Sequence, residues 1–278
     1  MSPCFLALLN SFKTNQEIIM NPLSLPLKLS LDNFRYIFTG MKLAKPMLNS
    51  LLMCAGVIGS LITIGPMAAY SIMRRRMATG KFLRVFFLIG LTIPFQIIMV
   101  PLLKMFGAMG ISSGSGNYLF RGLVLEIGSL RIPLDTHVSY LALLLHYVSW
   151  GLPLCIFIYG AFMTTVPREL EEAAAIDGCG QVGTFWRIVF PLLTPCTVTI
   201  IIFWGLWIWN DFMQAFIVMG PSKGQLAFVQ LYRFLNDQYV KNWNHIFAGV
   251  VVLSAPVTVL YVAMQRRFVK GLTAGSFK

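Results

Sequence analysis

Five long apolar segments constrain what this chain can fold into more than any other feature of its sequence. The clearest, residues 46–73, contains no charged side chain. An α-helix needs about 20 apolar residues to cross the ~30 Å hydrocarbon core of a bilayer. The other segments approach or exceed that length, at residues 85–103, 138–163, 188–210 and 246–264. Because they are too long for buried strands and lack period-two alternation, we predict an all-α polytopic membrane protein.

The composition agrees with the membrane class. Hydrophobic residues make up 57% of the chain and charged residues 12%, whereas a soluble domain is about 45–50% apolar and about 25% charged. The formal net charge of +12 fits basic residues that flank spans and meet anionic headgroups. No basic run interleaved with aromatic residues lies away from the apolar segments. We therefore expect the lipid bilayer, and not nucleic acid, as a partner.

Prolines interrupt the apolar segments and predict kinked helices, which membrane bundles tolerate. They are Pro66, Pro94, Pro153, Pro195 and Pro256. The first nine residues are apolar but too short to span, and they lack the basic region and cleavage site of a signal peptide. We interpret them as the end of a helix. The expectation is one transmembrane domain, residues 1–278, with five full spans and a truncated first one.

The distribution of lysine and arginine predicts the orientation. These residues are about twice as dense in 74–84, 164–190 and 265–278 as in the segments on the opposite side. Because basic loops remain in the cytoplasm, we predict that these three segments are cytoplasmic.

The sequence carries no recognisable catalytic or metal-binding pattern. The five cysteines form no C-x-x-C pair and the three histidines lie far apart, so we expect no disulfide framework and no metal site. No G-x-x-x-x-G-K-[ST] loop for ATP is present. Two alternatives to a subunit of a larger transporter stay open at this point. One is an intramembrane enzyme that uses His146 and Tyr147, and the other is a secondary transporter driven by an ion gradient.

Four of the ten acidic residues of the chain gather in residues 169–178, ELEEAAAIDG. The pattern predicts a short helix capped by Thr164 or Thr165, with Pro167 at its first helical position and its glutamates near the positive end of the helix dipole. Three alanines give it a small-residue face, and Gly178 with Gly180 end it. An ordinary solvated loop is one interpretation. We favour a helix that docks into a groove of a partner.

This stretch resembles the EAA loop of binding-protein-dependent ABC importer permeases. That loop has Glu-Ala-Ala, three residues, Gly, nine residues, Ile, two residues and Pro, which here are Glu172, Ala173, Ala174, Gly178, Ile188 and Pro191. Phe190 stands where the family more often has Leu. The stretches SFKTNQEI, NPLSLP, WNDF and QRRFVKGLTAGSFK resemble the maltose-type smaller permease subunit of the carbohydrate subgroup. The resemblance covers nearly the whole chain, although residues 114–137 look longer than usual for the family.

The resemblance implies a type I ABC importer permease fold with about five to six transmembrane helices. Loop 164–190 would be the coupling loop, whose contacts to the ATPase would be Glu171, Glu172, Ala173, Ala174, Asp177, Gly178, Ile188 and Pro191. The cytoplasmic tail 265–278 would reach the ATPase dimer interface through Gly271, Leu272, Thr273, Ala274 and Gly275. The external loop 220–243 would contact a substrate-binding protein.

The implied protein is not an enzyme and holds no cofactor, since ATP and magnesium would bind the partner ATPase. It would be a multi-pass subunit of a bacterial-type inner membrane importer for a sugar, an oligosaccharide in particular. Its partners would be a second permease subunit in a heterodimer, an ATP-binding cassette ATPase dimer and an extracytoplasmic sugar-binding protein.

The residues near the end of the fourth long segment are candidates for the substrate pathway: Trp204, Trp207, Asn210 and Asp211. Tryptophans can stack on sugar rings, but an interfacial aromatic belt explains them as well, and we favour the belt for Trp209. Asp211 is either a functional acid at the membrane level or a solvated group at a helix end.

Overall fold

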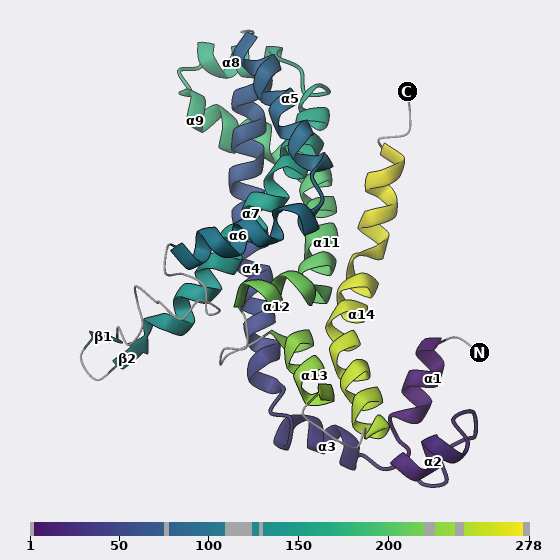
Figure 1. Cartoon of the computed structure of the whole chain (residues 1–278). Coiled ribbons are helices and arrows are strands. Elements are labelled where there is room, and N and C mark those ends of the chain that lie inside the picture. Colours follow the sequence, from purple (N-terminus) through teal and green to yellow (C-terminus); the bar gives the residue numbers. More distant parts are fainter. Residues whose placement is uncertain are drawn as a thin grey trace.

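The computed structural model describes residues 3–74, 78–108, 124–127, 130–219, 226–236 and 242–274. They form an elongated bundle of helices (Figure 1). Three helices are long and apolar enough to cross a membrane: α4 (Ala44–Arg74), α7 (Leu134–Met163) and α14 (Trp243–Ala274). In α7 and α14 the qualifying parts are Tyr140–Met163 and Trp243–Val262. The spans predicted at 46–73, 138–163 and 246–264 are therefore confirmed by length and composition.

The other two predicted spans are sharply bent. Helices α5 (Ala78–Thr92) and α6 (Phe95–Ala108) meet at 98° around Pro94. The helical segment Gln181–Leu192 meets α11 (Thr194–Asn210) at 73°, next to Pro195. Proline lacks an N–H and clashes with the carbonyl one turn earlier, which explains breaks at these places. The kinks predicted here are thus corrected to breaks between separate helices. Counting each pair as one span gives five among the described residues, within the predicted range.

The remaining elements are short. They are α1 (Pro3–Asn10), α2 (Asn15–Met20), α3 (Asp32–Thr39), α8 (Glu169–Ile176), α9 (Gln181–Thr184), the π-helix η1 (Phe185–Val189), α10 (Phe190–Leu192), α12 (Met213–Met219) and α13 (Ala227–Asn236). Strand β1 (Val124–Ile127) pairs antiparallel with β2 (Leu130–Pro133), with Leu125 opposite Ile132. This hairpin falls in the segment 114–137 that looked unusually long. It is the one departure from an all-helical architecture in the described part of the chain.

The core of the bundle is the contact of α4 with α7, against which α11 also packs. Two glycines let α4 and α7 approach closely. A Cβ atom on Gly151 would lie 2.9 Å from a methyl carbon of Leu61, and one on Gly65 would lie 3.1 Å from the Cβ atom of Cys155. Because lipid tails supply no hydrophobic force between helices, such close backbone contact is a main source of packing energy in a bilayer.

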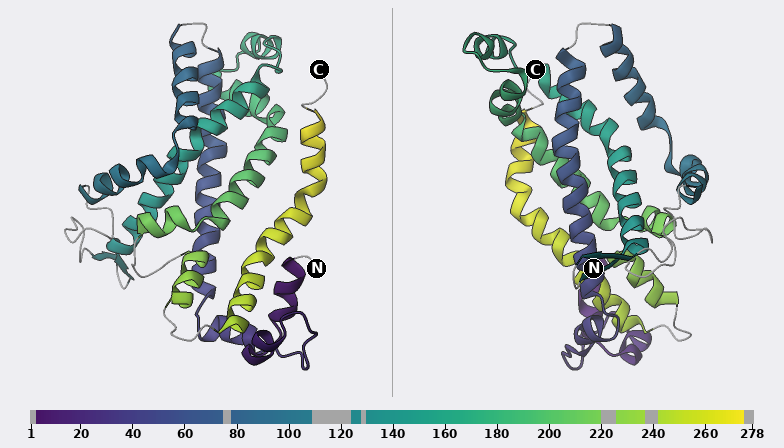
Figure 2. Two further views of the ribbon diagram at one scale, coloured as in Figure 1. Left: turned by 45° about the vertical axis from the view of Figure 1, so that its right-hand side comes forward. Right: turned by 90° about the vertical axis from the view of Figure 1, so that its left-hand side faces the viewer.

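The two ends of the bundle carry different segments. Helices α8 and α9, the start of α5 and the end of α14 lie at one end, at the top of Figure 1, while α1, α2, α3 and α13 lie at the other end. Figure 2 shows the same separation from two further directions. The described parts of the three segments that the lysine and arginine density grouped together therefore share one end of the molecule.

At the opposite end, hydrogen bonds from polar side chains connect the short helices to one another. The Asn33 side chain donates to the carbonyl oxygens of Ser11 and Lys13, both at 2.9 Å. Lys13 is 1% exposed, and its ammonium group donates to the carbonyl oxygens of Asn21 and Pro22 at 3.2 and 3.1 Å. Two backbone carbonyls thus take the place of water at this ammonium group.

Candidate functional site

Helix α8 follows α7 directly at one end of the bundle. Its N-cap residue is Arg168, with no capping bond from the side chain. The hydroxyls of Thr164 and Thr165 instead donate to the carbonyl oxygens of Ala161 and Phe162 at 2.7 and 2.8 Å. The predicted threonine cap is therefore wrong, because both hydroxyls bond back to the last turn of α7. Pro167, predicted at the first helical position, precedes the N-cap, since α8 begins only at Glu169.

The C-terminal end of α8 is a Schellman motif. The N–H of Gly178 donates to the Ala175 carbonyl at 3.1 Å, and the N–H of Cys179 donates to the Ala174 carbonyl at 2.9 Å. Gly178 has φ +79°, in the left-handed region, which costs a residue with a side chain about 1–2 kcal/mol. A Cβ atom there would meet nothing within 4 Å. The helix end predicted at Gly178 is confirmed, and backbone conformation explains the glycine.

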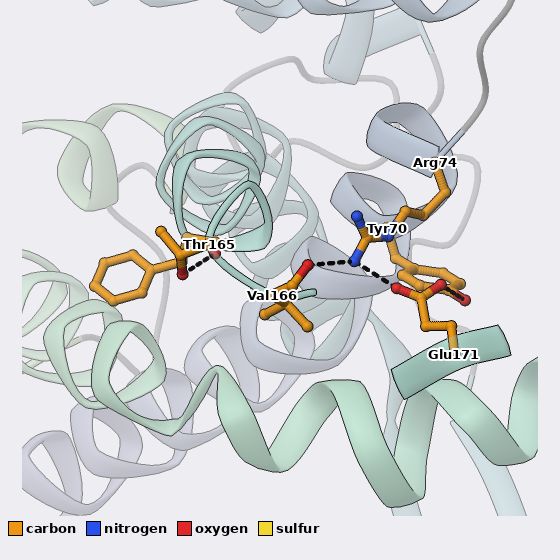
Figure 3. Close-up of polar contacts among 6 residues, drawn as sticks. Tyr70, Arg74, Thr165, Val166 and Glu171 are labelled. Carbon is orange, nitrogen blue, oxygen red and sulfur yellow. Dashed lines mark hydrogen bonds and ion pairs between the residues drawn. The ribbon is translucent and has the colours of Figure 1, made fainter. Parts of the chain in front are cut away.

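Glu171 anchors α8 to the last turns of α4 (Figure 3). Its carboxylate forms an ion pair with the Arg74 guanidinium and accepts a hydrogen bond of 2.8 Å from the Tyr70 hydroxyl. Arg74 also donates to the Val166 carbonyl at 3.2 Å, in the turn between α7 and α8. The Arg74 and Glu171 side chains are each 16% exposed. Arg74 thus binds α8 through Glu171 and the turn that leads into α8 through Val166.

The opposite face of α8 is open. Glu172 and Ala173 are exposed, and Ile176 is 87% exposed, whereas Ala174 on the inner face is 4% exposed. Val182, in the next helix, is 72% exposed. Adjacent glutamates point to different sides because successive residues in a helix turn by about 100°. Of the predicted contact residues, Glu172, Ala173, Asp177 and Gly178 face outward, while Glu171 and Ala174 face their own chain.

Ile188 and Pro191 lie in an irregular helix that continues from α9 to Leu192. Residues Phe185–Val189 form a π-helix, in which the N–H of Phe190 donates to the carbonyl of Phe185. Pro191 has no N–H to give, and a wider turn ahead of it accommodates its ring. The ring of Phe185 lies 5.2 Å from that of Tyr70. The same turn of α4 therefore supports both α8 and the segment that contains Ile188.

Three of the four candidate pathway residues lie together. Trp207, Asn210 and Asp211 line an open surface cavity of about 660 Å³ at the end of α11. Trp204 instead lies in the core and is 3% exposed. Trp209 is 4% exposed, and its indole N–H donates to the Leu253 carbonyl at 2.9 Å. The interpretation of Trp209 as an interfacial belt residue is therefore wrong, because α14 covers its ring.

Asp211 joins α7 to the start of α12. It accepts a hydrogen bond of 2.6 Å from the Tyr147 hydroxyl and one of 3.0 Å from the N–H of Ala215. One turn away, His146 and Gln214 form a second buried hydrogen bond of 2.8 Å between the same two helices. The two residues of the enzyme alternative thus tie helices together. Tyr70, Arg74 and Gln214 were not found from the sequence, since no local pattern pairs them with their distant partners.

Other predicted sites lie at the margin of the described structure. Residues Gly271, Leu272, Thr273 and Ala274 form the last turn of α14, and Gly275 lies outside the described residues. Of the predicted external loop 220–243, residues 226–236, which contain α13, and residues 242–243 are described, whereas 220–225 and 237–241 lie outside the described residues. In the described part of the chain, no three His, Cys, Asp or Glu side chains are placed to hold a metal ion.

Comparison with known families decides the class of the protein. Residues 61–274 match the family described as binding-protein-dependent transport system inner membrane component. The chain belongs to this family. It is therefore a multi-pass inner membrane component of a transport system and not an enzyme, and the family sets aside the self-contained alternatives.

Two curated relatives resemble the chain over most of their length. The probable starch degradation products transport system permease protein AmyC of Thermoanaerobacterium thermosulfurigenes is 30% identical over all of this chain and 92% of its own. The melibiose/raffinose/stachyose import permease protein MelC of Bacillus subtilis is 30% identical over 91% of this chain and 83% of its own. A solved bacterial ABC transporter involved in the import of the acidic polysaccharide alginate shares the fold, with a TM-score of 0.75 and 14% identity over 96% of this chain and 90% of that one.

Proposed function

We propose that this chain is the membrane-spanning permease subunit of an ATP-driven, binding-protein-dependent sugar importer, with oligosaccharides as its substrate class. Support for a sugar comes from relatives named for starch degradation products and for melibiose, raffinose and stachyose. A further relative, from Streptococcus mutans, is named as a multiple sugar-binding transport system permease. The chain forms half of the translocation pathway, and a second permease subunit forms the other half.

Helix α8 is the coupling helix of this proposal. The observation that carries it is the division of its faces: Glu171 is bonded to Arg74, while Glu172 and the 87% exposed Ile176 remain free for a partner. A helix that is fixed on one side and open on the other transmits a push to the span behind it as a rigid element. The partner is an ATPase dimer, which binds ATP and magnesium and opens and closes as ATP is bound and hydrolysed.

In this proposal, the bent helix pairs move during transport and the surface cavity binds the sugar. In an alternating-access cycle, movement of α8 reorients the segments that break at Pro94 and Pro195. Trp207 offers an aromatic face to a sugar ring, and Asn210 with Asp211 offers hydrogen-bonding groups to its hydroxyls. An extracytoplasmic binding protein delivers the sugar at the end that carries α13, and the C-terminal tail 265–278 reaches the ATPase dimer.

The test is to purify the tagged chain from its native membrane in mild detergent and to identify what accompanies it. We expect an ATPase subunit and a second permease. Glu172→Arg should lose the ATPase, whereas Lys28→Glu, a charge reversal on an exposed residue at the far end, should retain it. A wild-type chain that is folded, monomeric and alone would overturn the proposal.

The substrate class has its own test. In vesicles that contain the assembled transporter, Trp207→Ala should reduce uptake of an oligosaccharide such as raffinose at unchanged assembly. Tyr261→Phe, on an exposed position of α14, is the matched control. Uptake of an amino acid or a peptide in preference to any sugar would contradict the assignment of oligosaccharides.

A further inference from the structure

A cavity that the transport pathway does not use lies between α4, α5 and α7. It measures about 220 Å³ and is lined chiefly by apolar side chains, among them Met73, Phe87, Pro153, Phe157 and Ile156. Phe157 and Leu88, at its rim, are 53% and 42% exposed. The cavity therefore opens on the outer surface of the bundle and not into its core.

The length of the cavity matches one leaflet of a bilayer. Its lining runs along α7 from Pro153 to Ala161 and ends at Thr164, one residue beyond that helix. At a rise of 1.5 Å per residue this stretch covers about 16 Å, which is about half of a ~30 Å hydrocarbon core. Met73 and Thr164 belong to the end of the bundle that carries α8. The groove thus extends from that membrane surface to about the midplane.

The side chain of Arg84 places a positive charge at the side of this groove. Arg84 is exposed and lies in the second turn of α5, inside the helix pair that makes one span. Its Nε donates to the Gly80 carbonyl at 3.3 Å, so the guanidinium is turned back toward the start of the helix and the membrane surface. No carboxylate within the described residues forms an ion pair with it. A guanidinium at the membrane surface is placed to meet the phosphate of an anionic headgroup.

We propose that this groove binds an anionic phospholipid of the leaflet on the α8 side. One acyl chain occupies the apolar groove between α5 and α7, and the phosphate meets the Arg84 guanidinium. Basic residues between transmembrane helices are known to bind anionic headgroups. The lipid braces α5 against the last turns of α7, directly before the turn that leads into α8. The inference rests on the membrane class of the chain and does not depend on which substrate it transports.

The experiment measures lipid binding to the purified transporter complex by native mass spectrometry. Dioleoyl-phosphatidylglycerol and dioleoyl-phosphatidylcholine are titrated separately. Arg84→Gln should lower the affinity for phosphatidylglycerol about fivefold and leave that for phosphatidylcholine unchanged. Arg84→Lys, which keeps the charge, should retain most of the affinity. Lys81→Gln is the matched control, because Lys81 is exposed on the same helix but does not line the cavity.

A second pair of variants tests the acyl-chain groove. A Cβ atom on Gly160 would meet only Met73, at 3.6 Å, so Gly160→Ala should fold and bind lipid normally. Gly160→Leu should fill the groove and weaken phosphatidylglycerol binding although Arg84 is intact.

The proposal fails if Arg84→Gln binds phosphatidylglycerol as the wild type does, or if both lipids bind equally. A photo-crosslinking amino acid in place of Phe157 shows whether a lipid or the second permease subunit occupies the groove. Labelling of lipid supports the proposal, and labelling of the second permease subunit would overturn it. Because these readouts measure binding and not uptake, they separate this inference from the proposed transport function.

Discussion

The Arg74 guanidinium in the last turn of α4 forms an ion pair with the Glu171 carboxylate in the first turn of α8. Each charge stands at the helix end that favours it, because the C-terminal end of a helix is partly negative and the N-terminal end partly positive. The pair joins two segments of the chain that lie far apart in sequence. The ion pair therefore fixes the short helix α8 on the end of the membrane-spanning helix α4.

Removing Arg74 should loosen α8. In Arg74→Gln the Glu171 carboxylate, 16% exposed, loses its cation and keeps only the Tyr70 hydroxyl. Removing one partner of a buried ion pair costs about 3–5 kcal/mol. Because this pair is only partly buried, we expect the lower end of that range, a fall of about 3 kcal/mol in the free energy of local opening of α8. Hydrogen–deuterium exchange of residues 169–178 measures it.

The exposed neighbour Glu169 provides the control for that variant. Glu169→Gln should change the opening free energy by less than about 0.5 kcal/mol, as is usual for surface substitutions. The double variant Arg74→Glu with Glu171→Arg should recover only part of the loss, since each charge then opposes its helix dipole. Equal protection of α8 in Arg74→Gln and the wild type would show that the pair is not its anchor.

Substitutions of Gly178 should rank by backbone conformation and not by size. Because φ is +79° and a Cβ atom would meet nothing within 4 Å, alanine should cost about 1–2 kcal/mol in α8 stability. Asparagine, which adopts this conformation more readily, should cost less. Exchange protection of the Gly178 and Cys179 amides reports the effect. If asparagine disrupted the assembled transporter more than alanine, contact with a partner would be the dominant constraint.

Tyr147→Phe should destabilise the junction of α7 and α12. The variant removes the 2.6 Å hydrogen bond to Asp211 from a fully buried position. A hydrogen bond to a charged acceptor contributes about 1.5–3 kcal/mol to stability. The N–H of Ala215 still donates to Asp211, so α12 should remain folded. The midpoint of thermal unfolding in detergent should fall for Tyr147→Phe and stay unchanged for Tyr261→Phe. Identical midpoints would show that this hydrogen bond does not stabilise the junction.

The stability of α2 should fall at acidic pH. The Thr14 N–H donates to the Glu17 carboxylate at 2.8 Å, and the Glu17 N–H donates to the Thr14 hydroxyl at 3.3 Å. The Thr14 hydroxyl also donates to this carboxylate, at 3.0 Å, and the two bonds to the carboxylate, that from the Thr14 backbone above all, hold the pKa of Glu17 below its ordinary value of 4.5. Because the folded state binds this proton less readily, the stabilisation is complete above about pH 4.5 and is lost as the pH falls through the folded pKa.

Glu17→Gln separates this effect from other acidic groups. Glutamine keeps an acceptor in the capping box but does not titrate there. Exchange protection of residues 15–20, corrected for the intrinsic rate, should therefore depend on pH in the wild type and not in the variant. Burial lowers the pKa of the nearby Lys13 from 10.5, and that residue remains charged under acidic conditions. The same pH dependence in both proteins would refute the assignment to Glu17.

Local patterns determined much of this protein in advance. The lengths of the apolar segments predict the spans, because crossing a bilayer depends on the hydropathy of consecutive residues. The end of α8 at Gly178 follows from the sequence as well, since a glycine after a helical run supplies the left-handed residue of a Schellman motif. The density of lysine and arginine grouped the segments that share one end of the bundle.

Tertiary structure decided what neighbouring residues of the same type do. Glu171 and Glu172 are indistinguishable in sequence, but only Glu171 faces Tyr70 and Arg74 across the packed end of α4. Pro94 lies at a 98° break, whereas Pro153 remains inside the continuous helix α7, which packs along α4. Proline removes a hydrogen bond at either place. Whether the chain then bends depends on contacts made by distant segments, and no local pattern contains them.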